Sequence, residues 1–388
     1  MTDKTSNEHA IGQRDRQLSA YSYTLPPSRI AQTPLTPRDQ SKLLVIDGKQ
    51  THQHGHFYEL ADWLLPGDLL VLNNTKVIPA RLLGYKSSGA AVEVLLIEPI
   101  DGDRWLALVR PGKRIQPGAE IWFGKREIGK PEIGKLESNA ERNIEKPLLI
   151  GFVEARDEAT GGRVIKLVPQ VEGSIDELIY QLGQVPLPPY ITASEALPDQ
   201  YQTVFAERKG AIAAPTAGLH FTETLLTKLK SKGIQTAEVT LHVGIGTFRP
   251  VEVTDIETHE MHQERIEVPA LTVEKIRETK ANGGRVIAIG TTSTRALEGA
   301  AAICGELKPY SGRTDLFIYP GYQWQVIDGM ITNFHLPGSS LLMMVSALIG
   351  RERLMQIYED AIAQDYRFYS FGDAMLILPD ATLKGTRL

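Results

Sequence analysis

The sequence predicts an α/β protein, in which a mostly parallel sheet with flanking helices carries an inserted small β-barrel domain. Two patterns in the 388 residues predict this fold. From Gly67 to about Pro169, short apolar runs are separated by Pro-Gly, Asp-Gly and Gly-Gly pairs, which is typical of a small barrel or sandwich. After Val171, helical patterns alternate with apolar strands, which indicates βαβ units around a parallel sheet.

The inserted domain consists of short predicted strands. They are expected at residues 68–72, 91–97, 105–109, 148–153 and 163–168. Between them, residues 124–146 are charged and repeat Gly-Lys every five residues, a period that fits neither a helix nor a strand. We therefore expect a solvated loop at 124–146.

The α/β part begins with a predicted strand at Leu43–Ile46. Further helices are expected at 222–230, 272–282, 294–302 and 341–349, with strands at 237–243 and 286–289. Thr222 is a suitable N-cap for the first of these helices, and Gly233 is a suitable stop. The predicted domains are a disordered polar leader at 1–18, a discontinuous α/β domain at 19–66 and 171–388, and the barrel at 67–170.

Composition excludes several classes of protein. Lysine plus arginine number 42 and aspartate plus glutamate 47, a net charge of −5, which excludes binding to nucleic acid by bulk charge but allows a local basic face. The single cysteine, Cys304, excludes a disulfide within the chain and a cysteine-ligated zinc or iron–sulfur site. The N-terminus is polar and the longest apolar run, 341–349, is too short to span a bilayer, so we expect a cytoplasmic protein.

Two glycine-containing turns follow predicted strands. Residues 290–298 open a helix, whose free N–H groups and dipole would stabilise an anion by roughly 0.3–1 kcal/mol, with help from Arg295. The alternative is N-capping by Thr291 or Ser293. Residues 242–249 resemble the start of a dinucleotide fingerprint, but its third glycine falls on Arg249, so this segment suits a nucleoside without phosphates or a simple turn.

Residues 207–221 contain several side chains that could bind a ligand or take part in catalysis. Arg208 and Lys209 are adjacent cations, 215–218 is a tight loop of small residues, and His220 precedes a helix. Small residues leave room for a ligand, and a histidine can transfer protons near neutral pH. The alternative is a structural histidine in the core. His335, in the loop 333–340, is a further residue that could face the same cleft.

Other histidines and cations have competing interpretations. In 259–262, His-Glu-Met-His is one residue short of the zincin spacing, so an acid–base or hydrogen-bonding role is favoured over a metal. His52, His54 and His56 alternate along a predicted strand, where a surface strand is favoured over a metal clip. The cations in 73–81 and 110–114 are either solvated or part of a phosphate-contacting face.

Taken together, these segments resemble the S-adenosylmethionine:tRNA ribosyltransferase-isomerase family of queuosine biosynthesis. The resemblance extends from about Ser22 to Ile377. Only the leader and the insertion at 124–146 depart from it. The matching stretches are 72–82, 207–222, 242–251, 290–298, 314–321, 333–347 and 366–376.

The resemblance implies an α/β domain with an inserted β-barrel and an enzyme that uses S-adenosylmethionine as a co-substrate. Its ribosyl part would be transferred to the aminomethyl group of a 7-deazaguanine at the anticodon wobble position of tRNA and isomerised. The products would be epoxyqueuosine-tRNA, adenine and methionine. The resemblance implies neither a permanently bound cofactor or metal nor a membrane partner. It also implies that the protein is a monomer.

The resemblance and the chemistry together suggest site residues. The acidic ribose proton beside the sulfonium needs a base, and the departing adenine needs an acid. Proton transfer is assigned first to His220 and then to His242, Glu260 and His262, with acid and base left open. The proposed ligands of S-adenosylmethionine are Thr216, Gly218, Gly244, Gly246, Thr291, Thr292 and Arg295. The proposed tRNA contacts are Lys76, Arg81, Arg110, Arg208, Lys209 and Arg249.

Two other classes of function stay open. A methyltransferase would use the same co-substrate, although the missing third glycine and the lack of an acidic ribose-binding residue oppose it. A non-catalytic RNA-binding protein is the other alternative. A radical enzyme is excluded, because one cysteine cannot hold a three-cysteine cluster.

Overall fold

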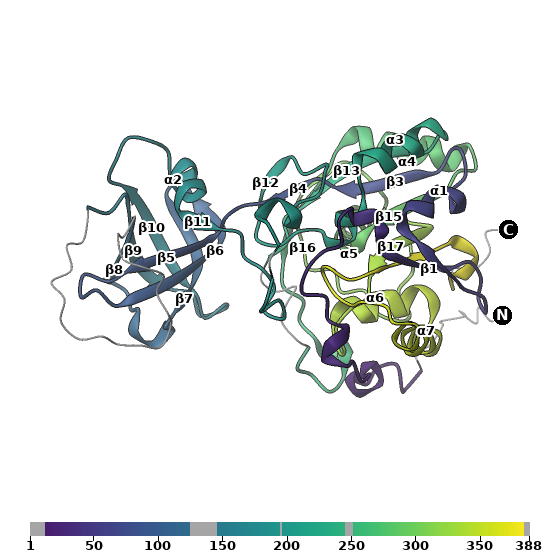
Figure 1. Ribbon diagram of the computed structural model, residues 1–388, viewed down its shortest axis with the longest axis horizontal. Helices are drawn as coiled ribbons and strands as arrows, with labels where there is room; N and C mark the ends of the chain where they lie inside the picture. The colour runs from purple at the N-terminus through teal and green to yellow at the C-terminus, as the bar shows by residue number, and fades with distance from the viewer. Residues whose placement is uncertain (1–11, 125–145, 195, 245–250, 384–388) are drawn as a thin grey trace, which may run out of the picture. The chain divides into compact units, whose positions relative to one another are not determined.

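The structure is a computed structural model that describes residues 12–124, 146–194, 196–244 and 251–383. The chain forms two compact units. The barrel unit is Val77–Leu187, and the sheet unit combines Met1–Lys76 with Pro188–Leu388 (Figure 1). The sequence places these boundaries at 67 and 170, which is wrong at both ends. Residues 69–73 form a strand of the large sheet, and the helix at 175–182 packs in the barrel unit.

The sheet unit is built on nine strands in the order β16-β14-β13-β3-β15-β17-β18-β1-β2. These strands are β1 (Lys42–Ile46), β2 (Gln53–His56), β3 (Leu69–Asn73), β13 (Gln235–Leu241), β14 (Glu264–Val268), β15 (Val286–Ile289), β16 (Tyr310–Thr314), β17 (Gly329–Asn333) and β18 (Ala374–Ile377). A separate two-stranded sheet pairs β4 (Thr75–Val77) with β12 (Arg208–Ala211).

Helices cover both faces of this sheet. The helices are α1 (Leu60–Trp63), α3 (Glu223–Ser231), α4 (Ala270–Ala281), α5 (Gly290–Cys304), α6 (Ser340–Ile349) and α7 (Arg351–Ala363). Side chains alternate between the two faces of each strand, so Leu44 and Ile46 join one core while Leu43 and Val45 join the other. The first core includes α4 to α7, and the second includes α1 and α3.

The expectation of a mostly parallel sheet is wrong, because the sheet is mixed. β13, β3, β15 and β17 are parallel neighbours, and β1 is parallel to β18. The pairs β17–β18, β13–β14, β14–β16 and β1–β2 are antiparallel. A single crossover helix carries the chain back to the starting end of the strands, so the next strand is parallel to the last. Two helices, α6 and α7, connect β17 to β18, so the chain enters β18 at the end where it left β17 and the two strands are antiparallel.

The barrel unit confirms the prediction of an inserted β-barrel. Its strands are β5 (Arg81–Tyr85), β6 (Ala91–Asp101), β7 (Arg104–Arg110), β8 (Glu120–Phe123), β9 (Leu149–Arg156) and β10 (Arg163–Pro169). They pair in the order β5-β6-β7-β10-β9-β8, all antiparallel, and a β5–β8 pairing closes the ring. The short β11 (Gly183–Gln184) adds to β5, and α2 (Ile175–Leu182) precedes it. Ser174 caps α2 by accepting from the Glu177 N–H.

Two predictions about flexible segments have different outcomes. Residues 12–18 do not form a disordered leader, because Asp15 pairs with buried Arg351 and Tyr21 donates to the Asp15 carbonyl. Residues 1–11 lie outside the described residues, as do 125–145 of the predicted loop. Within the described part of the chain, none of the helices has both the length and the apolar character needed to cross a bilayer.

Candidate active site

A cleft in the sheet unit lies beyond the ends of three parallel strands. β13, β15 and β17 are followed by Val243, Gly290 and Phe334, and all three residues line the cleft. Because the strands run parallel, their carboxyl ends meet at one edge of the sheet, where α/β proteins commonly bind ligands. The cleft encloses about 680 Å³ of empty space, part of it open to solvent. Further lining comes from residues 213–217, Tyr190, Tyr369 and Ser370.

The start of α5 supplies polar groups to this cleft. Gly290 has φ of +84°, a left-handed conformation that glycine adopts without strain, and a Cβ there would lie 3.4 Å from the Ala217 Cβ. The predicted ligand residues Thr291 and Thr292 both line the cleft. The Thr292 hydroxyl is buried and has no hydrogen-bond partner among the described residues. A buried unpaired hydroxyl beside free helix N–H groups suits a polar ligand.

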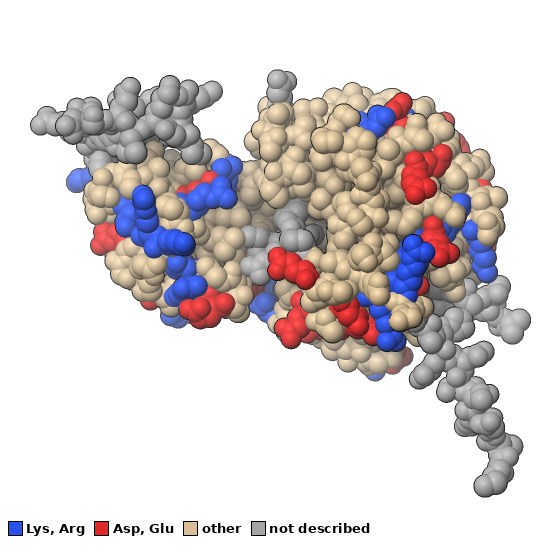
Figure 2. Space-filling view, turned by 90° about the horizontal axis from the view of Figure 1, so that it is seen from below, with Lys and Arg blue, Asp and Glu red and all other residues tan. Residues whose placement is uncertain are grey.

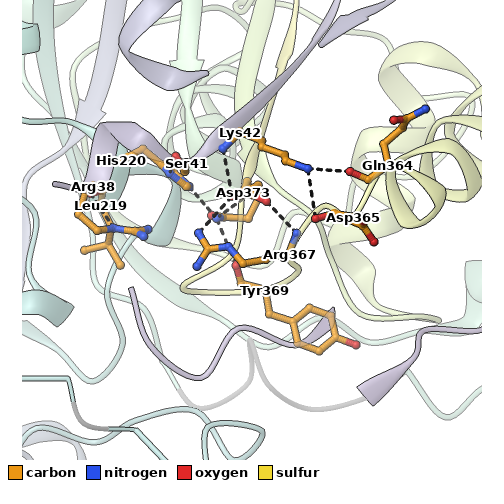
Figure 3. A network of polar contacts seen from close by, with 11 residues as sticks. Arg38, Ser41, Lys42, Leu219, His220, Gln364, Asp365, Arg367, Tyr369 and Asp373 are labelled. Atoms are coloured by element: carbon orange, nitrogen blue, oxygen red, sulfur yellow. Dashed lines mark hydrogen bonds and ion pairs between the residues drawn. The ribbon is translucent and has the colours of Figure 1, made fainter. Parts of the chain in front are cut away.

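Thr216 lines the cleft as predicted, and its hydroxyl donates to the Asn333 Oδ1 over 2.9 Å. Asn333 ends β17 and also lines the cleft. Its Nδ2 lies 3.0 Å from the Nε2 of His220, whose Nδ1 lies 2.7 Å from the Ser41 hydroxyl. Figure 3 shows His220 beside Ser41 within a network that includes Arg38, Arg367 and Asp373. His220 is therefore one residue removed from the cleft wall.

Aromatic side chains form another part of the wall. The rings of Tyr190 and Tyr369 lie 4.8 Å apart, and the Tyr190 hydroxyl is 2.6 Å from the Ser370 hydroxyl. Tyr369 has φ of +71°, an uncommon backbone conformation of the kind that concentrates at functional sites. His335 lines the cleft as expected, and burial lowers its pKa to about 3. Its imidazole is therefore neutral near pH 7.

Arg295, predicted to meet an anionic ligand, is instead paired inside the protein. It is buried, and its guanidinium bonds the buried carboxylate of Glu264 and donates to the Leu316 carbonyl. The other Glu264 oxygen lies 3.8 Å from the His262 Nε2 and 3.4 Å from the Gly244 N–H. That His262 nitrogen is buried without a hydrogen-bond partner among the described residues.

Three further predicted residues of the sheet unit do not line the cleft: His242, Glu260 and Gly218. His242 bonds the Thr75 hydroxyl over 2.8 Å, and burial lowers its pKa. Glu260 is exposed. A Cβ on Gly218 would come within 2.7 Å of the Phe205 ring, so this glycine serves close packing. Two further predicted residues, Gly246 and Arg249, lie outside the described residues.

Sequence reasoning missed three residues of this region: Asn333, Glu264 and Tyr369. Asn333 had a readable signal, because it is a polar residue at the end of an apolar strand and belongs to a quoted motif. Tyr369 also lies in a matching stretch, 366–376, but nothing distinguishes it there from the neighbouring aromatic residues, and Glu264 lies outside all seven stretches. Their importance follows from long-range contacts with Arg295 and Tyr190.

Comparison with known proteins identifies the family. The model of the family described as queuosine biosynthesis protein matches residues 18–377. The chain belongs to this family.

Members of the family match over nearly their full length. The S-adenosylmethionine:tRNA ribosyltransferase-isomerases of Acaryochloris marina and of a Nostoc species are 59% and 58% identical to this chain. Each alignment covers 95% of this chain, and 95% and 93% of the relatives. A crystal structure of S-adenosylmethionine tRNA ribosyltransferase from Thermotoga maritima is 39% identical, with a TM-score of 0.51, covering 92% of this chain and all of that one.

The cations that are predicted to contact tRNA lie on both units of the chain. In the sheet unit, Lys76 is half-buried, whereas Arg208 and Lys209 are exposed. In the barrel unit, Arg81 pairs with Glu93 over 2.7 Å, and Arg110 is exposed. Figure 2 shows Lys and Arg side chains gathered on the visible face of the barrel unit.

The histidines near β2 form a polar cluster with α7. The Nε2 atoms of His52 and His54 lie 2.9 and 3.1 Å from one Asp360 oxygen, while His56 stacks on Tyr58. Three such side chains could hold a metal ion. However, Arg353 lies 3.0 Å from the His52 Nδ1, which makes that nitrogen the acceptor and leaves the proton on Nε2. The cluster is therefore satisfied as a hydrogen-bonded group.

Proposed function

We propose that this chain transfers the ribosyl part of S-adenosylmethionine to the aminomethyl group of a 7-deazaguanine in tRNA and isomerises it, releasing adenine and methionine. The observation that carries this proposal is 59% identity over 95% of the chain to a relative named for the reaction. The cleft supports it, because five of the seven stretches that resemble the family contribute to its wall or to the groups behind it.

S-adenosylmethionine is proposed to lie in the cleft at the end of the parallel strands. The carboxylate of its methionine part would meet the free N–H groups at the start of α5, where the Thr292 hydroxyl is unpaired among the described residues. The tyrosine pair Tyr190 and Tyr369 offers flat apolar surface for the adenine.

Among the expected proton-transfer residues, His262 has the environment that suits the task best. Its Nε2 is buried and unpaired among the described residues, and the Glu264 carboxylate lies 3.8 Å away. Glu264 also accepts from Gly244, the neighbour of the cleft residue Val243. A carboxylate near one ring nitrogen of a histidine orients the ring, so that the other nitrogen can take up a proton. His242 and Glu260 are the other candidates. The acceptor is proposed to be tRNA with the modified base at the wobble position, bound by a monomer.

The experiment that tests this function follows both substrates. The full chain is incubated with S-adenosylmethionine and tRNA carrying the aminomethyl-deazaguanine, and free adenine, methionine and S-adenosylhomocysteine are measured. Ribosyl transfer predicts equal amounts of adenine and methionine, and none with tRNA that carries guanine. Formation of S-adenosylhomocysteine would indicate a methyltransferase instead. Binding without consumption of either substrate would indicate an RNA-binding protein.

A matched pair of variants tests the site. Thr292→Val removes the unpaired hydroxyl and should raise the KM for S-adenosylmethionine by roughly 3- to 10-fold, the value of one hydrogen bond. Thr224→Val removes an exposed hydroxyl on α3 and should leave KM unchanged. Equal KM values for the two variants would contradict the placement of the ligand.

A further inference from the structure

We propose that His220 is a positioning residue, which holds the Asn333 amide so that Asn333 fixes the Thr216 hydroxyl in the cleft wall. The inference rests on the proposed function only in that the cleft is taken as the site of S-adenosylmethionine. It replaces the proton-transfer role that the sequence suggests for His220.

The orientation of the Asn333 amide is determined by two backbone carbonyls. Its Nδ2 lies 3.3 Å from the Tyr369 oxygen and 3.5 Å from the Asp373 oxygen. A carbonyl oxygen can only accept, so the atom that faces both must be the NH₂ group. The opposite orientation would place the Asn333 Oδ1 against two acceptors. Oδ1 consequently faces Thr216, whose hydroxyl donates to it over 2.9 Å.

The proton on His220 follows from this orientation. Asn333 Nδ2 is a donor, so the His220 Nε2, 3.0 Å away, must accept and carries no proton. A neutral imidazole then holds its proton on Nδ1, which donates to the Ser41 hydroxyl over 2.7 Å. Both ring nitrogens are therefore used within the protein.

The surroundings of His220 keep it neutral and in place. The side chain is completely buried, and its ring stacks on Phe57 with centroids 5.0 Å apart. Burial is the main cause that lowers the pKa of His220 well below its usual value, and the guanidinium groups of Arg38 and Arg367 lower it further. Figure 3 shows Arg38 near His220 and Arg367 in the middle of the same network, beside Asp373.

This chain of hydrogen bonds has a consequence for the ligand. Because the Thr216 hydroxyl donates its hydrogen to Asn333, only its lone pairs are available to a ligand in the cleft. Thr216 should therefore accept from a ligand N–H or O–H, the chemistry of an amino group or a ribose hydroxyl. His220 acts on the ligand only through Asn333 and Thr216, since Asn333 and Thr216 line the cleft and His220 is absent from its wall.

Replacement of His220 by two side chains separates positioning from proton transfer. His220→Gln places an amide oxygen near the former Nε2 and retains an acceptor for Asn333, but it cannot act as a base. His220→Leu removes the acceptor. We expect His220→Gln to keep kcat within about threefold of the original enzyme, and His220→Leu to lose roughly 10- to 100-fold, the effect of a misplaced contact group. His56→Gln, on β2, is the matched control and should leave kcat unchanged.

The pH profile of kcat is a second test of whether His220 positions Asn333 or transfers a proton. A positioning residue leaves the shape of the profile intact, so His220→Gln should show the same limbs as the original chain. If His220→Gln is as inactive as His220→Leu, or if it loses a limb of the profile, His220 transfers protons and the inference is wrong. If the original chain releases no adenine, the proposed function fails instead, and the inference is then decided by the tautomer of His220.

The tautomer can be measured on the folded chain without activity. Nitrogen-15 NMR of histidine distinguishes a protonated ring nitrogen from an unprotonated one, and His220→Gln assigns the signal by its disappearance. We expect the proton of His220 on Nδ1 and an unprotonated Nε2 between pH 6 and 8. A proton on Nε2, or a doubly protonated ring, would overturn the inference whether or not His220→Leu folds.

Discussion

The two units of the molecule differ in how many polar side chains they bury and in what those side chains bond. In the sheet unit, charged and polar side chains are buried together and bonded to one another, as Glu264 is to Arg295 and Asn333 is to His220. Among the described residues of the barrel unit, Arg163 is the one buried polar side chain. Its guanidinium donates to four backbone carbonyls, those of Gly112, Ile115, Gly161 and Gly162.

Because of this contrast, substitutions are expected to affect stability and ligand binding together in the sheet unit, but separately in the barrel unit. Buried polar groups in the sheet unit form the cleft and also support the core, so changing one affects both properties. In the barrel unit, Arg163 anchors the segment Gly112–Arg114, which displays Lys113 and Arg114 to solvent. These exposed cations can be changed with little effect on the core.

The largest effect is expected from breaking the buried ion pair of the sheet unit. Arg295 and Glu264 are both 3% exposed, and Arg295→Met removes the guanidinium that balances the charge of the buried carboxylate. We expect a loss of about 3–5 kcal/mol in the free energy of unfolding, measured with urea. The control is Arg16→Met, which breaks an exposed pair with Glu257 (46% and 30% exposed side chains) and should cost about 0–1 kcal/mol. Equal losses would show that burial of the pair is unimportant.

A smaller effect is expected from acid. The pKa of His335 is lowered to about 3 in the folded chain, and that of His220 is also lowered, whereas an unfolded histidine titrates near 6.5. The unfolded state therefore binds these protons first, and the stability that neutral histidines contribute is complete above about pH 6.5 and is lost as the pH falls toward 3.

Hydrogen exchange at pH 7 and pH 5, corrected for intrinsic rates, tests this prediction in each unit. The sheet unit should lose protection at pH 5, and His335→Asn should reduce that loss. The barrel unit, residues 77–187, contains no histidine and is its own control. A similar loss of protection in both units would contradict the assignment to histidines.

The smallest effect on stability is expected from the exposed cations of the barrel unit. Lys113→Gln combined with Arg114→Gln should change the free energy of unfolding by less than about 0.5 kcal/mol. If these cations belong to a phosphate-contacting face, one of the two interpretations of the cations in 110–114, the salt dependence of tRNA binding should become shallower by roughly 1.5 in log–log slope, because two contacts are lost. The KM for S-adenosylmethionine should not change. Lys308→Gln, in the sheet unit, is the control, and an unchanged slope in the barrel variant would exclude Lys113 and Arg114 from the tRNA contact.

Several elements could be predicted because their determinants are local in the sequence. Helix α3 follows from the cap Thr222, and the barrel follows from short apolar runs between turn residues. The cleft residues Thr216, Thr291 and Thr292 could be found because they directly follow strands or begin a helix. The boundaries at 67 and 170 could not, since β3 looks the same as a barrel strand until its partners β13 and β15 are known.

The sequence by itself determined the family, the barrel, the helices α3 to α6, the strands β1, β13 and β15, and the segments that surround the cleft. The tertiary structure decided what each polar side chain does there. Arg295 was expected to face a ligand, and the fold pairs it with Glu264, 31 residues earlier in the chain. His220 was expected to transfer protons, and the fold surrounds it with Ser41 and Asn333. The physical reason is that a local pattern specifies backbone conformation and burial, whereas hydrogen-bond partners come from distant segments that only packing brings together.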